Sequence, residues 1–361
     1  MEPTVLIEES SPLCPMVAFV EESNQCVYFY LMEHAAEERS LRAVWVCNYG
    51  KAPAEISTED MERGLPPRLP ASLCAHPEGA DALDPDKLRI IWFEEGDAAA
   101  LLYEEEILAI IPGWGGNREY PGYARDCIDF SPYAMPLGSP AENRLFDRVE
   151  RARQFFQSWD EESWPRLQES LLTAIEGRLG SHDRYYAIDG GDWPPKAMVT
   201  MEQDDITYAV TLGVSAVPQP LVEQYTEEPE LWRRIELALS LPTSVLQKNE
   251  SGILEYLSGL PLIPWHQITY LGHTHTIDCD AFSVFDERFT AVMLVHAPPS
   301  APEIPFAPYR GDRVCLLWVV PITAEEHAYA MQNGGTALLQ KVKPEAADTL
   351  WLCNGKVKFD V

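Results

Sequence analysis

Short apolar runs alternate with polar turns over the first 140 residues, a pattern that predicts β-structure. Apolar or aromatic segments occur at Met16–Val20, Cys26–Leu31 and Ala43–Cys47. Leu88–Phe93 and Glu106–Ile111 predict two further strands, which flank an acidic turn at residues 94–97. Residues 1–140 are therefore expected to form an N-terminal β-rich α+β domain with one mixed sheet.

The middle of the chain has helical periodicity. One helix is expected over residues 142–159, because its apolar side chains recur on one face: Leu145, Phe146, Val149, Phe156 and Trp159. A second helix is expected over residues 164–179, with Ser163 as its N-cap and Gly180 as its end. Residues 141–180 are thus expected to be a helical connector.

Residues 181–361 return to strand-like patterns. The expected strands are Ala197–Met201, Ile206–Ser215, Ile235–Leu239, Phe289–Val295 and Val314–Val320. The last two are continuous apolar runs, as in strands covered on both faces. Thr323 and Glu326 form a capping box before a helix that ends at Gly334-Gly335, and Asn354-Gly355 predicts a C-terminal hairpin. The expected fold class is α+β, with two mixed β-sheet domains joined by a helical segment.

The charge of the chain is strongly negative. It has 57 acidic and 27 basic residues, a formal net charge of −30, and the acidic residues are spread over both halves. This excludes a general electrostatic attraction to nucleic acid or anionic lipid, because such binding needs a basic face. The negative charge is compatible with a basic protein partner. It is equally compatible with a function of the charge in solubility alone.

The eight cysteines predict a reducing environment. No pair has C-x-x-C spacing and several lie in apolar runs, so they are expected to be reduced core residues of a cytoplasmic protein. The first twenty residues include Glu8 and Glu9 and lack a basic region, so no signal peptide is expected. No apolar run is long enough for a membrane span.

Several blocks in the second half resemble a known family. They are Arg234–Pro242, Leu257–Leu262 with Trp265, Gly272-His273-Thr274, Phe289–Leu294, Leu317–Glu326 and Asn333–Leu339. In this order they resemble the bacterial form of the suppressor of fused domain, over residues 185–345, here with an N-terminal extension. The resemblance implies an α+β domain that binds protein without an established catalytic activity. Bacterial relatives are thought to include immunity proteins against secreted toxins.

A polar cluster suggests an alternative function. His273 and His275 alternate, so in a strand both rings face one side, and with Cys279 they supply three ligands suited to zinc. The alternative is therefore a metal-dependent enzyme that uses the His266/His273/His275 region. The histidines are also consistent with turn and surface positions, and no second Cys/His pair has finger spacing. No stoichiometric zinc and no other cofactor are expected.

Six residues are candidates for partner binding. Asp204 with Asp205, and Asp278 with Asp280, pair carboxylates beside predicted strand ends, where loops on a rigid scaffold carry function. Trp193 lies in the loop Asp189-Gly190-Gly191-Asp192-Trp193 and is either a partner contact or an interdomain plug. His273 lies in the Gly-His-Thr turn. The expected function is a non-enzymatic cytoplasmic protein-binding module, immunity-type or regulatory. It would occlude a basic toxin or bind an extended peptide, with no nucleic acid or membrane involved.

Overall fold

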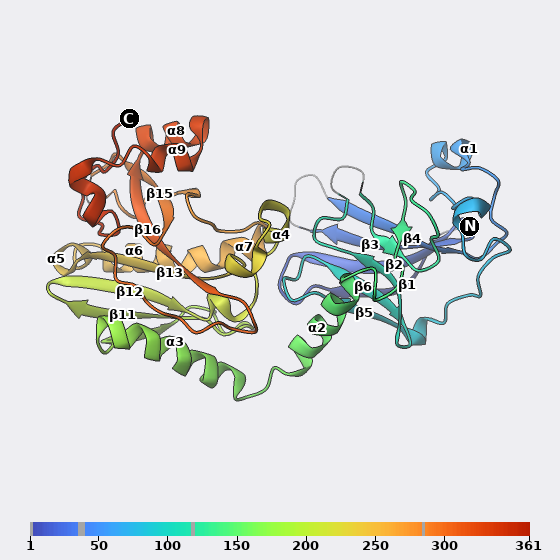
Figure 1. The fold of residues 1–361 in the computed structure, drawn as a ribbon, viewed down its shortest axis with the longest axis horizontal. Coiled ribbons are helices and arrows are strands. Elements are labelled where there is room, and N and C mark those ends of the chain that lie inside the picture. The colour runs from blue at the N-terminus through green and yellow to red at the C-terminus, as the bar shows by residue number, and fades with distance from the viewer. Residues whose placement is uncertain (1–2, 35–39, 117–119, 284–285) are drawn as a thin grey trace. The chain divides into compact units, whose positions relative to one another are not determined.

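The chain folds into two compact units. The computed structural model describes residues 3–34, 40–116, 120–283 and 286–361 (Figure 1). Unit 1 holds the residues up to Trp159 together with Glu223–Tyr225 and Trp265–Ile268, and unit 2 holds the rest. Helices and open sheets, mostly antiparallel, occur together in the described chain, which confirms the α+β fold class.

Unit 1 contains two sheets where one mixed sheet was expected. The first is an antiparallel meander of β1 (Thr4–Ser10), β2 (Met16–Ser23), β3 (Cys26–Glu33) and β4 (Leu41–Asn48). The second has the order β5 (Leu88–Trp92), β6 (Ala99–Tyr103), β7 (Glu106–Ile111), β8 (Tyr123–Ala124) and β9 (Met135–Pro136). β4 contacts β7 and β8, so the sheets pack on each other. The chain leaves the first sheet because the intervening segment carries prolines and only short helical turns: α1 (Thr58–Glu62), η1 (Ala71–Leu73) and η2 (Pro85–Lys87).

Strand β6 was missed by the sequence prediction. β5 and β7 are not neighbours, because β6 lies between them and pairs with both. Its residues are almost all buried, yet it begins with alanines, which have low β propensity, and it is followed by Glu104–Glu106. Its strand conformation is therefore determined by its central position in the sheet.

The two central helices belong to different units. α2 (Leu145–Gln157) lies in unit 1 and contacts β5, while α3 (Ser163–Leu179) lies in unit 2 and contacts β12. The division into domain 1–140, connector 141–180 and domain 181–361 stays a prediction.

Two details of these helices differ from expectation. In α2 the fully buried aromatic ring is Phe155, one position before the predicted Phe156. Ser163 is not the N-cap of α3; Glu162 occupies that position, and the Ser163 hydroxyl donates to the Asp160 carboxylate at 2.6 Å. The predicted end of α3 is confirmed, since Gly180 has a φ of 84°.

Unit 2 is built on one seven-stranded sheet. Its order is β10-β11-β12-β13-β16-β15-β14, and only β13 and β16 are parallel. The strands are β10 (Arg184–Ala187), β11 (Ala197–Gln203), β12 (Ile206–Leu212), β13 (Arg234–Pro242), β14 (Thr276–Asp278), β15 (Phe289–His296) and β16 (Val314–Thr323). The five predicted strands are confirmed, except that the one predicted over Ile206–Ser215 ends at Leu212, because Gly213 takes a φ of 89° and Val214–Ala216 turn into a short 3-10 helix. The two edge strands β10 and β14 were not predicted.

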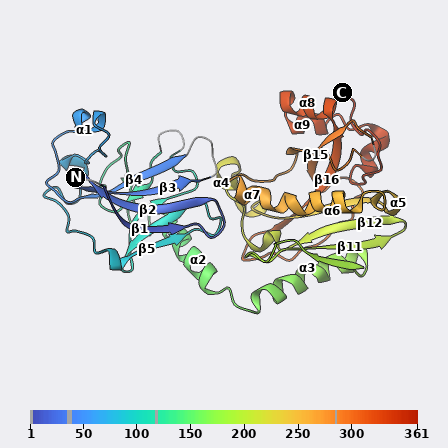
Figure 2. The same cartoon turned by 180° about the vertical axis from the view of Figure 1, so that it is seen from behind.

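Several helices pack on this sheet: α3 and α5 (Thr243–Leu246) contact β12, and α8 (Ala324–Asn333) contacts β15 and β16. The other helices of the C-terminal half are η3 (Val214–Ala216), α4 (Val222–Tyr225), η4 (Pro229–Leu231), α6 (Glu250–Gly259), η5 (Leu260–Leu262), α7 (Ile263–His266), α9 (Gly335–Leu339) and η6 (Pro344–Thr349). Residues 223–225 of α4 and 265–266 of α7 belong to unit 1. Figure 2 shows α6 running alongside the strands of unit 2. The capping box of Thr323 and Glu326 at the start of α8 is confirmed. β16 is buried along its whole length, as its continuous apolar run predicts.

The predicted C-terminal hairpin is wrong. Leu352 forms an isolated β-bridge with Ser240 of β13, and Phe359 forms one with Val342. Phe359 is buried, and its N–H donates to the Glu326 carboxylate. The Lys358 ammonium donates to three main-chain carbonyls of residues 349–352. The tail therefore finds its hydrogen-bond partners in the core of unit 2, and the local Asn-Gly signal is overridden.

The cysteines behave as expected from their apolar surroundings. All eight are free and buried. Burial raises the pKa of the Cys26 and Cys315 thiols to about 12, so they are protonated at neutral pH. In the described part of the chain, no helix combines the length and apolar character needed to cross a membrane.

Candidate functional site

The sheet register places the four candidate aspartates at one end of the seven-stranded sheet. Asp204 and Asp205 form the two-residue turn between β11 and β12, with φ values of 53° and 65°, as in the left-handed turns that suit hairpins. Ile206 pairs with Pro242 at the C-terminal end of β13, which runs parallel to β16. The C-terminal end of β16 pairs with the start of β15, and Asp278 of β14 pairs there with Ala291. We call this end of the sheet, with Asp204, Asp205, Asp278 and Asp280, the acidic end.

The two aspartate pairs do not form one cluster. Four strand spacings separate β12 from β14, which corresponds to about 19 Å across the sheet. The side chain of Asp278 is 93% exposed, and Asp204, Asp205 and Asp280 are also exposed. The acidic end therefore presents two separate pairs of solvated carboxylates.

A groove lies beside the second pair. It has a volume of about 570 Å³, runs between α6 and β14, and is lined by Glu255, Tyr256, Asp278 and Asp280 among others. The Tyr256 hydroxyl donates to the main-chain carbonyl of Asp278 at 3.2 Å, and burial raises the pKa of this tyrosine, so it remains a donor. The described residues that line this α6–β14 groove include three carboxylates and no basic side chain. The groove is therefore suited to a cationic group.

Trp193 and His273 lie at the opposite end of the sheet. Trp193 precedes β11, whose first residue pairs with Leu212 at the far end of β12. The His273 Nδ1 accepts a hydrogen bond from the main-chain N–H of His296, the last residue of β15. Both side chains are half-buried. The six sequence candidates are thus divided between two ends of the sheet and do not make one site.

A second cavity opens near His273. Its volume is about 510 Å³, and it lies between residues 297–306 and the start of β16. The His296 Nε2 is 3.2 Å from Arg313 Nη2, and because arginine only donates, this nitrogen accepts. The other nitrogen, Nδ1, then carries the hydrogen and donates to the Leu316 carbonyl at 3.1 Å. The His296 ring is therefore held between the Arg313 side chain and the Leu316 carbonyl.

The histidine region is engaged in local hydrogen bonds. The His275 Nδ1 accepts from the Gly272 N–H at 3.2 Å, in addition to the bond at His273. Burial lowers the pKa of both imidazoles and raises the pKa of the Cys279 thiol. His266 belongs to unit 1, whereas His273, His275 and Cys279 belong to unit 2. Within the described ranges, no group of three or more histidine, cysteine or acidic side chains has the arrangement needed to hold a metal ion.

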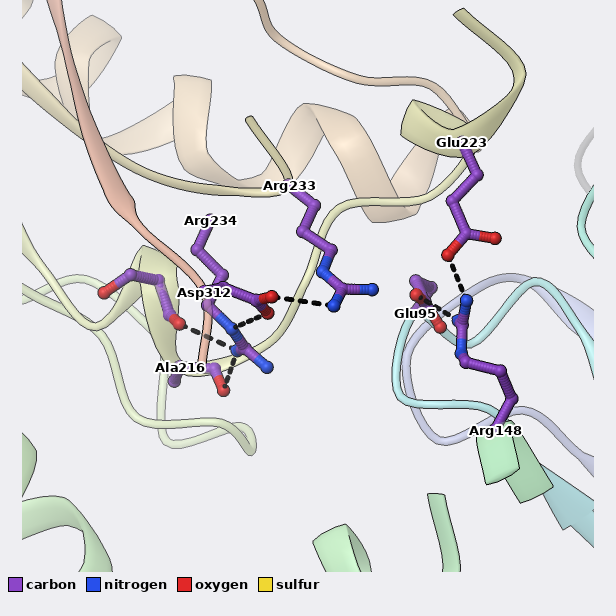
Figure 3. Close-up of polar contacts among 8 residues, drawn as sticks. Glu95, Arg148, Ala216, Glu223, Arg233, Arg234 and Asp312 are labelled. Atoms are coloured by element: carbon purple, nitrogen blue, oxygen red, sulfur yellow. Dashed lines mark hydrogen bonds and ion pairs between the residues drawn. The ribbon is translucent and has the colours of Figure 1, made fainter. Parts of the chain in front are cut away.

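A buried ion network lies at the end of the sheet opposite the acidic end and was missed by the sequence analysis (Figure 3). Arg234 is fully buried; its Nε donates to Asp312 at 2.8 Å, and its Nη1 donates to the carbonyls of Ser215 and Ala216. Arg233 donates to the other Asp312 oxygen at 2.7 Å. The network ties the start of β13 to Asp312, two residues before β16. The only sequence signal for it is the arginine pair at the head of an apolar strand.

Glu236 extends this polar core. Its carboxylate is fully buried and accepts from the Gly213 N–H, from the N–H and hydroxyl of Ser215, and from the Thr211 hydroxyl. Burial raises its pKa to about 7. Because the Ser215 hydroxyl is buried and donates to Glu236, it is not an exposed nucleophile. Figure 3 also shows a second ion group, in unit 1, where Arg148 contacts Glu95 at 2.7 Å and also contacts Glu223.

Comparison with known proteins identifies the second unit. Residues 192–353 match the family model described as Suppressor of fused protein (SUFU). These residues form a suppressor-of-fused family domain, which confirms the resemblance seen in the sequence blocks. No curated protein sequence matches the chain.

A solved structure described as "the Sufu-Fu complex crystal structure" aligns with 55% of this chain and 91% of its own. The aligned residues are 12% identical, with a TM-score of 0.37. A likeness at this level supports no conclusion about function.

Proposed function

We propose that the chain is a non-enzymatic protein-binding module, of the immunity or regulatory type, that occludes a basic protein partner. The observation that carries this proposal is the family match over residues 192–353, since the family is one of protein-binding domains. The partner is a basic toxin or a basic extended segment. The eight buried, free thiols support a reducing compartment such as the cytoplasm.

The acidic end supports the choice of a basic partner. Its two aspartate pairs are solvated, and the α6–β14 groove offers three carboxylates to a cationic side chain. Exposed charges are screened over about 8 Å at physiological salt. They act mainly on the rate of encounter, while closer contacts determine how long the complex lasts. The net charge of −30 also attracts a basic partner over a longer range.

The test compares the wild type with two charge-reversed variants. In the first, Asp204, Asp205, Asp278 and Asp280 are changed to lysine. In the matched control, four exposed glutamates elsewhere in unit 2 are changed to lysine: Glu169, Glu227, Glu228 and Glu345. Both variants change the net charge by the same amount, so they differ only in where the charge is placed. Proteins from the native cytosol that are retained by the wild type and the control, but not by the first variant, are purified and used for kinetics.

The expected result is a salt-dependent association rate. For the wild type, association slows clearly between low and high salt while dissociation changes little. The first variant associates more slowly than the control at low salt and approaches it at high salt. If both variants slow equally, the acidic end is not the contact surface. If wild-type association is independent of salt, the electrostatic account of partner choice is wrong.

A further inference from the structure

Unit 1 contains a cavity that lies outside the family match. It has a volume of about 370 Å³ and is bounded by Val46 of β4, Leu108 of β7, the residues after β8 and the loop of residues 76–83. This volume is at the small end of the range of ligand sites, which is typically 300–1,000 Å³. All of its lining residues belong to unit 1. The cavity is therefore suited to a small ligand or to a single side chain.

Asp126, one of the residues that line this cavity, has a buried carboxylate oxygen without a hydrogen bond. Asp126 is 3% exposed, and its Oδ1 accepts from the Nε of Arg125 at 2.7 Å. Its Oδ2 is buried and has no hydrogen-bond partner among the residues that the structure describes. A buried acceptor without a donor is destabilising. A donor that enters the cavity would supply the missing bond.

The charges around Asp126 favour a cation as this donor. Arg125 already pairs with two carboxylates, through Nε with Asp126 and through Nη1 with Glu106 at 2.8 Å. Asp81 adds a third carboxylate to the lining. The His76 Nε2 is 3.9 Å from Asp126 Oδ1, which is too long for a hydrogen bond, and its side chain is 55% exposed at the rim. Three carboxylates against one guanidinium leave a negative excess.

We infer that this cavity binds a primary alkylammonium group. Since Oδ1 of Asp126 is already engaged by Arg125, the carboxylate offers one oxygen, which suits a point-like ammonium better than the two-pronged guanidinium. The apolar side chains of Val46, Leu83 and Leu108 contact the alkyl chain. The group comes from a lysine side chain or from a free amine, which share this chemistry.

Calorimetric titrations test the inference with defined probes. The probes are 1-pentylamine, the neutral 1-pentanol of similar shape, and an acetylated and amidated Gly-Lys-Gly peptide. The proteins are the full-length wild type, Asp126→Asn, and the control Glu78→Gln. Glu78 is exposed, pairs with Lys51 and lies outside the cavity lining, so its change alters the net charge equally. A third variant, Leu83→Trp, fills the cavity from its loop side and keeps the test available if Asp126→Asn fails to fold.

The wild type and Glu78→Gln are expected to bind the amine probes, and Asp126→Asn and Leu83→Trp to bind them at least tenfold more weakly. Tighter binding of the peptide than of pentylamine assigns the site to a lysine side chain, and the reverse order assigns it to a free amine. Absence of amine binding to the wild type overturns the inference. Equal binding of pentanol and pentylamine, or undiminished amine binding by folded Asp126→Asn, also overturns it.

Discussion

Replacing Asp312 with alanine is expected to destabilise unit 2 by about 3–5 kcal/mol, the range for removing one partner of a buried ion pair. Asp312 is 2% exposed and holds two guanidinium groups at 2.7 and 2.8 Å. The change removes the Asp312 carboxylate from the fully buried Arg234. Arg234 keeps its bonds to two main-chain carbonyls and its contact with the Tyr309 ring at 5.3 Å. These remaining contacts favour the lower half of the range.

A control variant shows how much of the stability loss depends on burial of the ion pair. Asp286 pairs with Arg288 at 2.7 Å, the same distance as the shorter Asp312 bond, but the Arg288 side chain is 59% exposed. Solvent screens such a pair, so Asp286→Ala is expected to change the stability little. The two variants thus remove the same side chain from ion pairs of the same length. The Asp312 carboxylate is buried and holds two guanidinium groups, whereas the Asp286 carboxylate holds one exposed guanidinium group.

Urea unfolding followed by tryptophan fluorescence measures both changes, because Trp232, Trp318 and Trp351 report on unit 2. The Asp312→Ala midpoint should fall sharply while the slope of the transition stays the same. Similar losses for the two variants would refute the reasoning that burial sets the cost. A loss only in a transition assigned to unit 1 would refute the assignment of the network to unit 2.

Three further predictions concern the same polar core and the thiols. Gly213→Ala should lower the unfolding free energy by about 1–3 kcal/mol. Gly213 has a φ of 89°, and an added Cβ would lie 2.6 Å from both the Pro195 carbonyl and the Trp164 ring. Thermal unfolding measures the loss, and an unchanged melting temperature would contradict the prediction. Burial lowers the pKa of Lys196 from 10.5 to about 8, so between these pH values the unfolded chain binds more protons than the folded chain. The free energy of unfolding should therefore rise with pH from about 8 to 10.5. Urea titrations at several pH values measure this slope, and Lys196→Met should flatten it. Thiol titration should find eight reactive groups in unfolded protein and far slower reaction in the native state, whereas missing thiols in a fresh preparation would contradict the buried, free cysteines.

Local sequence patterns were sufficient for the elements whose structure depends on near neighbours. The five unit 2 strands, the capping box at Thr323 and the end of α3 at Gly180 were all predicted. Each rests on an interaction within a few residues, or on an apolar run long enough to require burial. The ordered blocks of the second half also sufficed to identify the suppressor-of-fused domain, which the family match confirms.

Tertiary structure decided the features that depend on distant partners. β6 becomes a strand because β5 and β7 pair with both of its edges, although alanines begin it. The C-terminal tail gives up its local hairpin because the Glu326 carboxylate accepts from the N–H of Phe359, 33 positions away. No pattern within either segment encodes these partners.

The arrangement of the candidate residues was likewise decided by tertiary structure. The sequence identified Asp204, Asp278, Trp193 and His273 as chemically distinctive, but strand order and register divide them between two ends of one sheet. The buried network around Asp312 and the orphan oxygen of Asp126 gave almost no sequence signal. Composition reveals which charges are present, whereas their burial and pairing depend on contacts between segments as far apart as residues 234 and 312. Those contacts form only when the strands and loops of the unit have assembled, because only then is water removed from the paired groups.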